Sequence, residues 1–280
     1  MNDNIGFASI GGASSGEPAA SSASQELRPR DVQTHNTSGL VSEQRQDAAS
    51  TLDLRVRWLS RMNFADALAL QEEIVAKKRE DRSSVDELLL LEHEPVYTIG
   101  RTPDQSSLLG TVHLPHPLFP INRGGQATYH GPGQLMGYPI IDLRRCGQDL
   151  HRYLRWLEQL LIELLEQYEI AATQREGLTG VWIDNPERIG PGCKIASIGV
   201  GVRYWITMHG FALNVCGDLS PFNFIIPCGI SDVAMTSMEK ETGRPFSVVD
   251  VAGAFEKLAT RRISDLRVDL PVSAVGVPCL

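Results

Sequence analysis

Residues 123–134 combine backbone freedom with polar chemistry, in the sequence Arg-Gly-Gly-Gln-Ala-Thr-Tyr-His-Gly-Pro-Gly-Gln. These twelve positions hold four glycines and a proline, together with polar side chains such as Arg123 and His130. Glycine adopts positive φ and lets the backbone approach a ligand closely. The apolar run 135–141 follows at once and predicts a buried strand that supports the segment. We therefore expect residues 123–134 to line a pocket; the alternative is a glycine-rich turn between two strands.

Cys228 lies in a Pro-Cys-Gly sequence and is the candidate nucleophile. The thiolate is the reactive form of cysteine, and a free thiol with a pKa of about 8.5 is mostly protonated at neutral pH. Most isolated cysteines behave instead as small buried hydrophobes. Here Pro227 rigidifies the approach, and Gly229 removes side-chain bulk beside the sulfur. Gly229 is also expected to leave backbone N–H groups free to face a developing oxyanion.

Lys194, in Gly-Cys-Lys-Ile-Ala, is the candidate proton acceptor for Cys228, because a desolvated lysine can serve as a base. On a strand it would share a face with Ala196 and Ile198 and point inward. The alternative is a lysine at a strand entrance with its ammonium in water. Cys193 is the rival nucleophile, but adjacent strand residues point to opposite faces, so its side chain should diverge from that of Lys194.

With residues 208–215, Met-His-Gly-Phe-Ala-Leu-Asn-Val, these segments resemble the octanoyltransferases of lipoate biosynthesis. In that family the glycine-rich loop, a Gly-x-Lys-Ile-Ala lysine and a Pro-Cys-Gly cysteine occur in this order. The resemblance covers about residues 55–250, and a three-part match in order is far more specific than any one part. It implies catalytic roles for Cys228 and Lys194. The substrate contacts that it implies are Arg123, Gly124, Gly125, Gln126, Ala127, Thr128, Tyr129, His130, Ser197, Ile198, Gly199, Gly210, Phe211 and Ala212.

The resemblance also implies a reaction. An octanoyl group passes from acyl carrier protein to a cysteine thioester, and then to a lysine on the lipoyl domains of 2-oxoacid dehydrogenases or on the glycine cleavage H protein. No cofactor, metal or ATP is expected. Two alternatives remain: an ATP-dependent lipoate or biotin ligase on the same fold, and a non-catalytic acyl- or carrier-binding module. The chain lacks the Arg-Arg-x-Ser-Gly-Gly-Gly sequence of lipoate ligases, and a binding module would not need the lysine and cysteine.

The remaining titratable residues do not form a recognisable metal site. The five cysteines include no Cys-x-x-Cys spacing, and their odd number argues against a disulfide framework, so a reducing compartment is expected. His130 and His209 could orient substrate, although a lone histidine is more often a hydrogen-bonded structural residue. Arg144, Arg145, Arg152 and Arg155 could dock an acidic carrier, or simply form a solvated helix face.

Composition indicates one globular enzyme behind a polar extension. The chain has 280 residues, 42% of them hydrophobic, and a formal charge of -8. Residues 1–50 are rich in Ser, Ala, Gly and Gln and are predicted to be disordered. They lack the apolar core of a secretory signal, and no stretch reaches membrane-spanning length. We expect a cytoplasmic monomer with no nucleic-acid or membrane partner.

Hydrophobic periodicity predicts an α/β (α+β) domain with a mixed sheet flanked by helices, over residues 51–265, followed by a loosely attached tail at 266–280. The resemblance specifies the biotin and lipoate protein ligase fold. Helices are expected from a cap at Asn63 to Glu80, over 149–169 and over 246–261. Strands are expected at 52–58, 88–91, 96–99, 135–141, 178–183, 194–203 and 207–215, with an exposed turn at 185–193.

Overall fold

The computed structural model describes residues 54–101, 106–108, 113–184, 192–230 and 233–267. All of them belong to one compact unit, Asp47–Leu280. The predicted disordered extension at 1–50 and residues 268–280 of the predicted tail lie outside the described residues, as does most of the expected turn at 185–193. No helix in the described part of the chain is long and apolar enough to cross a membrane.

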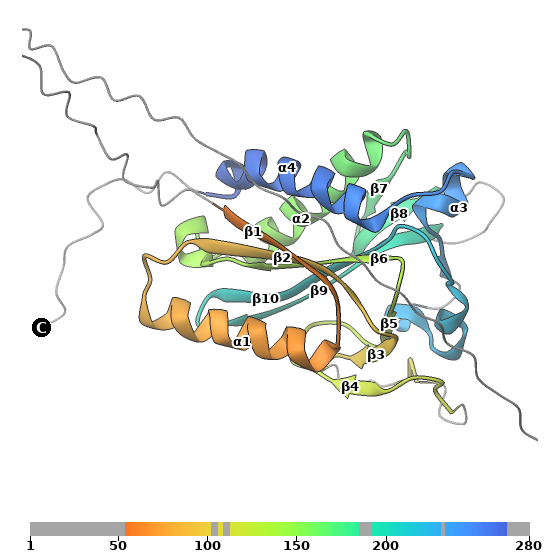
Figure 1. The fold of residues 1–280 in the computed structure, drawn as a ribbon, viewed down its shortest axis with the longest axis horizontal. Coiled ribbons are helices and arrows are strands. Elements are labelled where there is room, and N and C mark those ends of the chain that lie inside the picture. Colours follow the sequence, from red (N-terminus) through yellow and green to blue (C-terminus); the bar gives the residue numbers. More distant parts are fainter. Residues whose placement is uncertain (1–53, 102–105, 109–112, 185–191, 231–232, 268–280) are drawn as a thin grey trace, which may run out of the picture. The chain divides into compact units, whose positions relative to one another are not determined.

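A large mixed sheet forms the centre of the fold (Figure 1). The first two strands pair in parallel, and every later neighbour on the main path is antiparallel. A short strand, β11 (Ala234–Met235), adds in parallel to β9. The spatial order along the main path is β1 (Leu54–Met62), β2 (Asp86–His93), β6 (Gln134–Ile140), β10 (Ile206–Asn214), β9 (Cys193–Arg203), β8 (Leu178–Ile183) and β7 (Thr173–Arg175).

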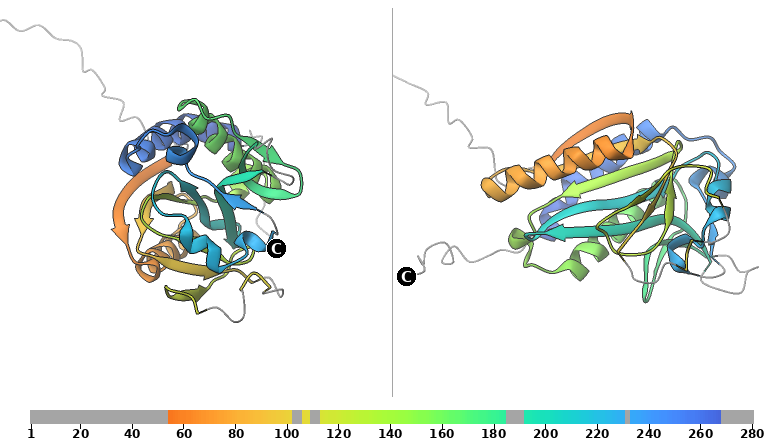
Figure 2. Two further views of the ribbon diagram at one scale, coloured as in Figure 1. Left: turned by 90° about the vertical axis from the view of Figure 1, so that its right-hand side faces the viewer. Right: turned by 90° about the horizontal axis from the view of Figure 1, so that it is seen from below.

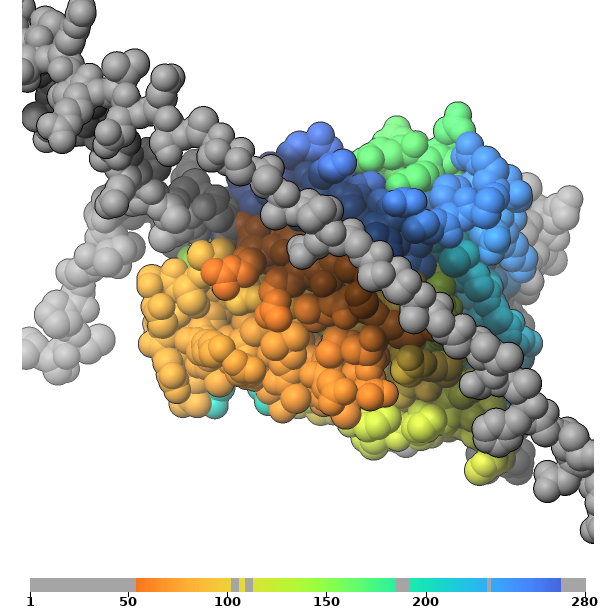
Figure 3. All heavy atoms as spheres, in the orientation of Figure 1, coloured from red at the N-terminus to blue at the C-terminus, as the bar shows by residue number. Residues whose placement is uncertain are grey.

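Helices cover both faces of this sheet, as Figures 1 and 2 show. Helix α1 (Phe64–Glu80) packs on one face, while α2 (Leu150–Glu166) and α4 (Val248–Leu266) pack together on the other. Alternate residues of β2 enter the two cores: Leu88 and Leu90 face α2 and α4, whereas Leu89 and Leu91 face α1. In the space-filling view of Figure 3, α1 and α4 form two opposite borders of the visible surface. The predicted α/β class with a helix-flanked mixed sheet is confirmed.

A second, three-stranded sheet stands beside the end of the large one. Its order is β4 (Leu118–Pro120), β3 (Val96–Ile99) and β5 (Thr128–His130). Tyr97, Tyr129 and Phe222 form the centre of a separate apolar cluster beneath it. The short helical elements are η1 (Leu143–Cys146), η2 (Ser220–Phe224), η3 (Pro227–Gly229) and α3 (Met238–Thr242).

The helix ends follow local sequence signals. Asp149 caps α2 by accepting the N–H of Arg152 at 3.0 Å, and an apolar stripe on this helix is buried as expected. Asn63 does precede α1, but its side chain donates to Asp66 and makes no cap bond to the backbone. The last helix continues beyond the expected end at 261, because Leu266 is buried in the core. Residue 266, the first of the predicted tail, is the last residue of this helix.

Candidate active site

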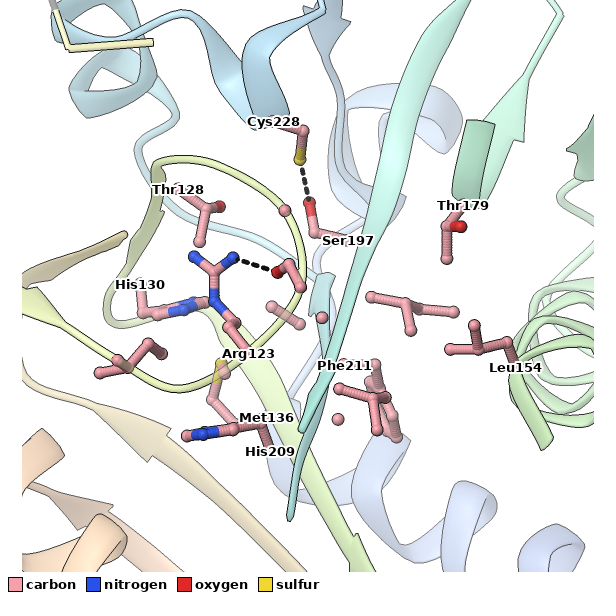
Figure 4. Close-up of a pocket in the computed structure, with 18 of the residues that line it drawn as sticks. Arg123, Thr128, His130, Met136, Leu154, Thr179, Ser197, His209, Phe211 and Cys228 are labelled. Atoms are coloured by element: carbon pink, nitrogen blue, oxygen red, sulfur yellow. Dashed lines mark hydrogen bonds between the residues drawn. The ribbon is translucent and has the colours of Figure 1, made fainter. Parts of the chain in front are cut away.

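A cavity of about 380 Å³ lies between the glycine-rich loop, the turn that carries Cys228, and strands β9 and β10. Its volume is in the range of small-molecule sites, roughly 300–1,000 Å³. In Figure 4, Cys228, Thr128 and Arg123 lie on one side of β9, while Thr179 and Leu154 lie on the other. Predicted substrate-contact residues on the wall are Arg123, Gly124, Gly125, Thr128, His130, Ser197, Ile198, Gly199, Gly210, Phe211 and Ala212.

Cys228 is held in an unusual backbone conformation inside η3. Its φ of 58° is in the left-handed region, which costs a non-glycine residue roughly 1–3 kcal/mol. Two hydrogen bonds fix the turn: the N–H of Cys228 donates to Ala127 O at 3.0 Å, and the N–H of Gly229 donates to Ile226 O at 3.0 Å. The expectation that Gly229 leaves N–H groups free for an oxyanion is therefore wrong. Glycine is needed there for packing, since a Cβ would lie 2.4 Å from the Gln126 side chain.

Lys194 is buried, with a relative exposure of 1%, and its Nζ lies 3.5 Å from Cys228 Sγ. The alternative of a lysine with its ammonium in water is therefore wrong. Opposite Val181 and Trp182 the pairing of β8 with β9 skips one residue of β9, so strict alternation fails and both Ile195 and Ala196 enter the core. Such bulges re-aim side chains, here that of Lys194 toward the thiol. Cys193 packs in the apolar core instead.

Two hydroxyl groups line the same cavity as the sulfur. Ser197 Oγ lies 4.0 Å from Cys228 Sγ, and Figure 4 shows the two side chains pointing toward one another. Thr128 Oγ1 is buried on the cavity wall and has no hydrogen-bond partner among the described residues. Since buried polar groups are normally paired, this hydroxyl is available to a ligand.

Arg123 brings a second cation to the cavity. Its guanidinium donates to Gly124 O at 2.8 Å, to Thr98 O at 3.0 Å and to Thr98 Oγ1 at 2.9 Å. Burial lowers its pKa, and the charge of Cys228 acts in the opposite direction. Among the described residues no Asp or Glu lines the cavity. The site is therefore electropositive and suited to an anionic sulfur or oxygen.

A directional chain of hydrogen bonds fixes that arginine. Thr98 Oγ1 accepts from Arg123 and lies 3.3 Å from His130 Nε2, while His130 Nδ1 lies 3.3 Å from Gln134 Oε1. Gln134 Nε2 donates to Tyr129 O, so its oxygen accepts, and His130 carries its proton on Nδ1. His130 is thus an orienting residue on the wall.

Both wall histidines are held neutral. Burial, with help from the charge of Arg123, lowers the pKa of His130 well below its usual value and that of His209 to about 4. Among the described residues, Lys194 and Ser197 make the hydrogen-bond contacts of Cys228 Sγ, and neither histidine does. Of the described titratable groups, Lys194 is thus the one placed against the thiol.

The predicted glycines serve packing as well as access. A Cβ on Gly210 would lie 2.1 Å from Gly137 O, and one on Gly199 would lie 2.8 Å from Arg123 Cδ. Gly210 therefore permits close strand pairing, while Gly199 makes room for Arg123. Both still border the cavity.

Three of the predicted contact residues lie behind the wall. Gln126 accepts the N–H of Ser107 at 3.1 Å and packs under Gly229. Ala127 supplies the carbonyl that holds Cys228, and Tyr129 points into the cluster beneath the small sheet. Alternation along β5 explains the last case, because Thr128 and His130 take the opposite direction.

Several wall and support residues have no sequence motif of their own. Phe64, Ile121, Met136 and Tyr138 close the apolar part of the cavity. Trp182 becomes a neighbour of Lys194 through strand pairing, and Thr98 becomes a neighbour of Arg123 through side-chain hydrogen bonds, so periodicity did not single them out. The one usable signal was Gly180 inside a strand, which typically marks a close approach.

The four arginines proposed for docking have structural partners. Arg144 pairs with Asp142 at 2.5 Å, Arg145 with Asp86 at 2.6 Å, and Arg155 with Glu158 at 2.5 Å. Arg152 donates to the carbonyl of Asp265. Because Arg144 and Arg145 are mostly buried, these contacts favour a role in the fold over a carrier-binding patch.

Comparisons with known proteins agree with this geometry. The family described as lipoyl protein ligase A/B catalytic domain matches residues 63–258. An octanoyltransferase of Geobacter sulfurreducens is 49% identical over 70% of this chain and 79% of its own length. One from Geobacter metallireducens is 47% identical over 78% of this chain and 99% of its own. A bipartite lipoate protein ligase from Thermoplasma acidophilum shares the fold, with a TM-score of 0.55 and 15% identity over 76% of this chain and 84% of its own.

Proposed function

Because the chain belongs to the octanoyltransferases within the lipoyl protein ligase A/B catalytic domain family, and is thus an acyltransferase of lipoate biosynthesis, we propose that it works through an octanoyl thioester on Cys228. The donor in this proposal is octanoyl-acyl carrier protein. The acceptor is a lysine on a lipoyl domain, as in 2-oxoacid dehydrogenases and the glycine cleavage H protein. The observation that carries the proposal is the contact of 3.5 Å between Lys194 Nζ and Cys228 Sγ, two residues that both line the cavity.

In the first step Lys194 takes the thiol proton, and the sulfur of Cys228 attacks the carbonyl carbon of the donor thioester. The tetrahedral intermediate then collapses, the bond from the carbonyl to the carrier sulfur breaks, and the leaving thiolate takes the proton from Lys194. The negative oxygen of the intermediate forms in an electropositive cavity. Thr128 Oγ1, which is buried and unpartnered among the described residues, can donate to it.

In the second step the neutral amine of the acceptor lysine attacks the acyl-enzyme. The bond from the carbonyl to Cys228 Sγ breaks as the amide forms, and the proton lost by the amine returns through Lys194 to the sulfur. One thioester and one amine thus give one amide and one thiol. Thioester exchange is nearly balanced and amide formation is favourable, so the sequence needs no ATP.

The apolar wall accounts for the acyl group. Ile198, Phe211 and Met136 line the cavity beside the small residues Gly199 and Ala212. Each methylene that leaves water for such a wall contributes about 0.8 kcal/mol. An eight-carbon chain therefore has enough apolar contact to hold it against the thiol.

An ATP-dependent ligase is the second candidate, because the fold is shared with lipoate ligases. A ligase would activate a free acid as an adenylate and would not require a nucleophilic thiol. Acceptor modification with octanoyl carrier protein is therefore measured with and without ATP, for the natural chain and for Cys228→Ala. Modification that is independent of ATP and lost in the variant supports the proposal. Modification that requires ATP and survives in the variant contradicts it.

A further inference from the structure

The side chain of Lys194 lies between the sulfur of Cys228 and the ring of Trp182. The two residues face one another across β8 and β9, and Nζ lies 4.8 Å from the ring centroid. That distance is within the range of a cation–π contact. Trp182 is completely buried, and its indole N–H donates to Leu178 O at 3.1 Å, which fixes the ring plane. The lysine therefore meets a rigid aromatic face.

A glycine provides the space for this arrangement. Gly180 has a φ of 126°, and a Cβ there would lie 2.6 Å from Lys194 Cε and 2.7 Å from Ala196 O. Its N–H donates to Glu158 Oε1 at 2.9 Å, so a buried side chain of α2 anchors the backbone beside the lysine. The stem of Lys194 thus runs through a notch that only glycine leaves open.

The charged groups around the notch already have partners other than Lys194. Glu158 holds the N–H of Gly180 and pairs with Arg155 at 2.5 Å. Arg123 faces the cavity from the glycine-rich loop as a second cation, and His130 is held neutral. No salt bridge to Lys194 is formed among the described residues. When Lys194 becomes an ammonium ion, the groups that its Nζ contacts among the described residues are the sulfur and the indole ring.

We propose that Trp182 is a positioning residue that acts through Lys194, with its ring stabilising the ammonium ion that forms when Lys194 takes the proton of Cys228. The inference rests on the proposed function, because it assumes that Lys194 is the proton acceptor. The negative face of the indole replaces the carboxylate that would otherwise balance a buried ammonium ion. A carboxylate would hold the lysine in place but would also compete with the thiolate for it.

Fluorinated tryptophans test this directly, because they weaken the ring's negative face with little change in shape. One to four fluorines are introduced at codon 182 only, since the chain has four tryptophans. The rate of Cys228 alkylation by iodoacetamide at neutral pH is followed by peptide mass. We expect a stepwise fall totalling about 3- to 30-fold, and a shift of the alkylation midpoint to higher pH.

Trp156 is the matched control. It is half-buried, stacks on Tyr153 and donates to Arg262 O, away from the cavity wall. The same fluorine series there should leave alkylation unchanged. Trp182→Phe, which keeps an aromatic ring, should fall between the natural chain and Trp182→Leu.

Lys194→Met distinguishes failure of the Trp182 inference from failure of the proposed function. If it lowers alkylation of Cys228 and makes the Trp182 series flat, the cation–π contact with Lys194 is supported. If Lys194→Met is impaired but fluorination of Trp182 has no effect in the natural chain, the inference is overturned and the proposed function stands. If Lys194→Met alkylates normally, the proton-acceptor role itself fails, and the inference fails with it.

Discussion

Two lysines of this chain are equally buried and serve different purposes. Lys78 and Lys194 both have a relative exposure of 1%. Lys78 Nζ lies 2.9 Å from Asp86 Oδ1 and donates to the carbonyls of Ser84 and Val85. Lys194 faces a thiol and an aromatic ring. Burial alone therefore does not mark a functional lysine; the partner decides whether its charge is fixed or can change during a reaction.

The surroundings of the two lysines differ in the same way. Burial lowers the pKa of Lys78, and the carboxylate of Asp86 works against that shift. Asp86 also binds Arg145 and Arg267, so it is the centre of a permanent ionic network. Around Lys194 the described residues of the cavity include no carboxylate. A catalytic base needs such freedom, because its protonation state must change in every cycle.

Replacing the two lysines by methionine should separate these roles most strongly. Lys194→Met removes the proton acceptor, so acyl transfer should fall by about 10²- to 10⁴-fold while the melting temperature changes little. Rates are measured with an octanoyl thioester at saturating acceptor, and stability by calorimetry. Normal turnover in Lys194→Met would show that this lysine is not the proton acceptor, and the contrast with Lys78 would then fail.

Lys78→Met should show the reverse pattern. The substitution removes one of the three cations that pair with the buried Asp86 and leaves Arg145 and Arg267. The free energy of unfolding should therefore fall by about 3 kcal/mol. The folded enzyme should retain its kcat/KM, because this network lies outside the catalytic cavity. Urea denaturation gives the stability, and a large loss of kcat/KM in the folded protein would count against a purely structural Lys78.

Buried histidines extend the comparison to groups without an opposite charge. Burial lowers the pKa of His93 and of His209 to about 4, against an ordinary value of about 6.5 in the unfolded chain. The unfolded chain takes up protons first, so the stability from each histidine is complete above pH 6.5 and is lost as the pH falls toward 4. The loss should approach about 3 kcal/mol for each.

Denaturation from pH 7 to pH 4 measures this effect. His93→Gln keeps a polar side chain without a titrating ring, so its stability should depend less steeply on pH than that of the natural chain. Equal slopes for both proteins would show that His93 does not titrate as its burial demands.

Thr128→Val should give the smallest of these effects. It removes a hydroxyl that has no partner among the described residues while keeping the branched shape. If that hydroxyl donates to the oxyanion, kcat should fall about tenfold with little change in KM or stability. Ser197→Ala is the matched control, because it removes the second cavity hydroxyl, which lies 4.0 Å from Cys228 Sγ. An unchanged kcat in Thr128→Val would assign the oxyanion to other donors.

Sequence reasoning located the residues whose chemistry shows in their own identity. Cys228 and Lys194 were singled out by motif, and α2 by its apolar stripe. The hydrogen-bond state of Gly229 was predicted wrongly, because a helical turn uses its N–H internally and no residue type signals that. Trp182 was missed because its role arises from strand pairing beside a bulge, and Thr98 because its role arises from a hydrogen bond with a loop residue distant in sequence; periodicity specifies neither. Contacts between segments that are distant in sequence therefore make otherwise ordinary buried residues part of the site.

In the proposed mechanism Cys228 carries the acyl group, and Lys194 enables it to do so. The most direct measurement is peptide mass analysis after mixing the chain with octanoyl carrier protein, without acceptor and without ATP. We expect one octanoyl group on Cys228, formed rapidly in the natural chain and in Lys78→Met, and slowly in Lys194→Met. An octanoyl group on Cys193, or no acyl-enzyme during active transfer to a lipoyl domain, would contradict it.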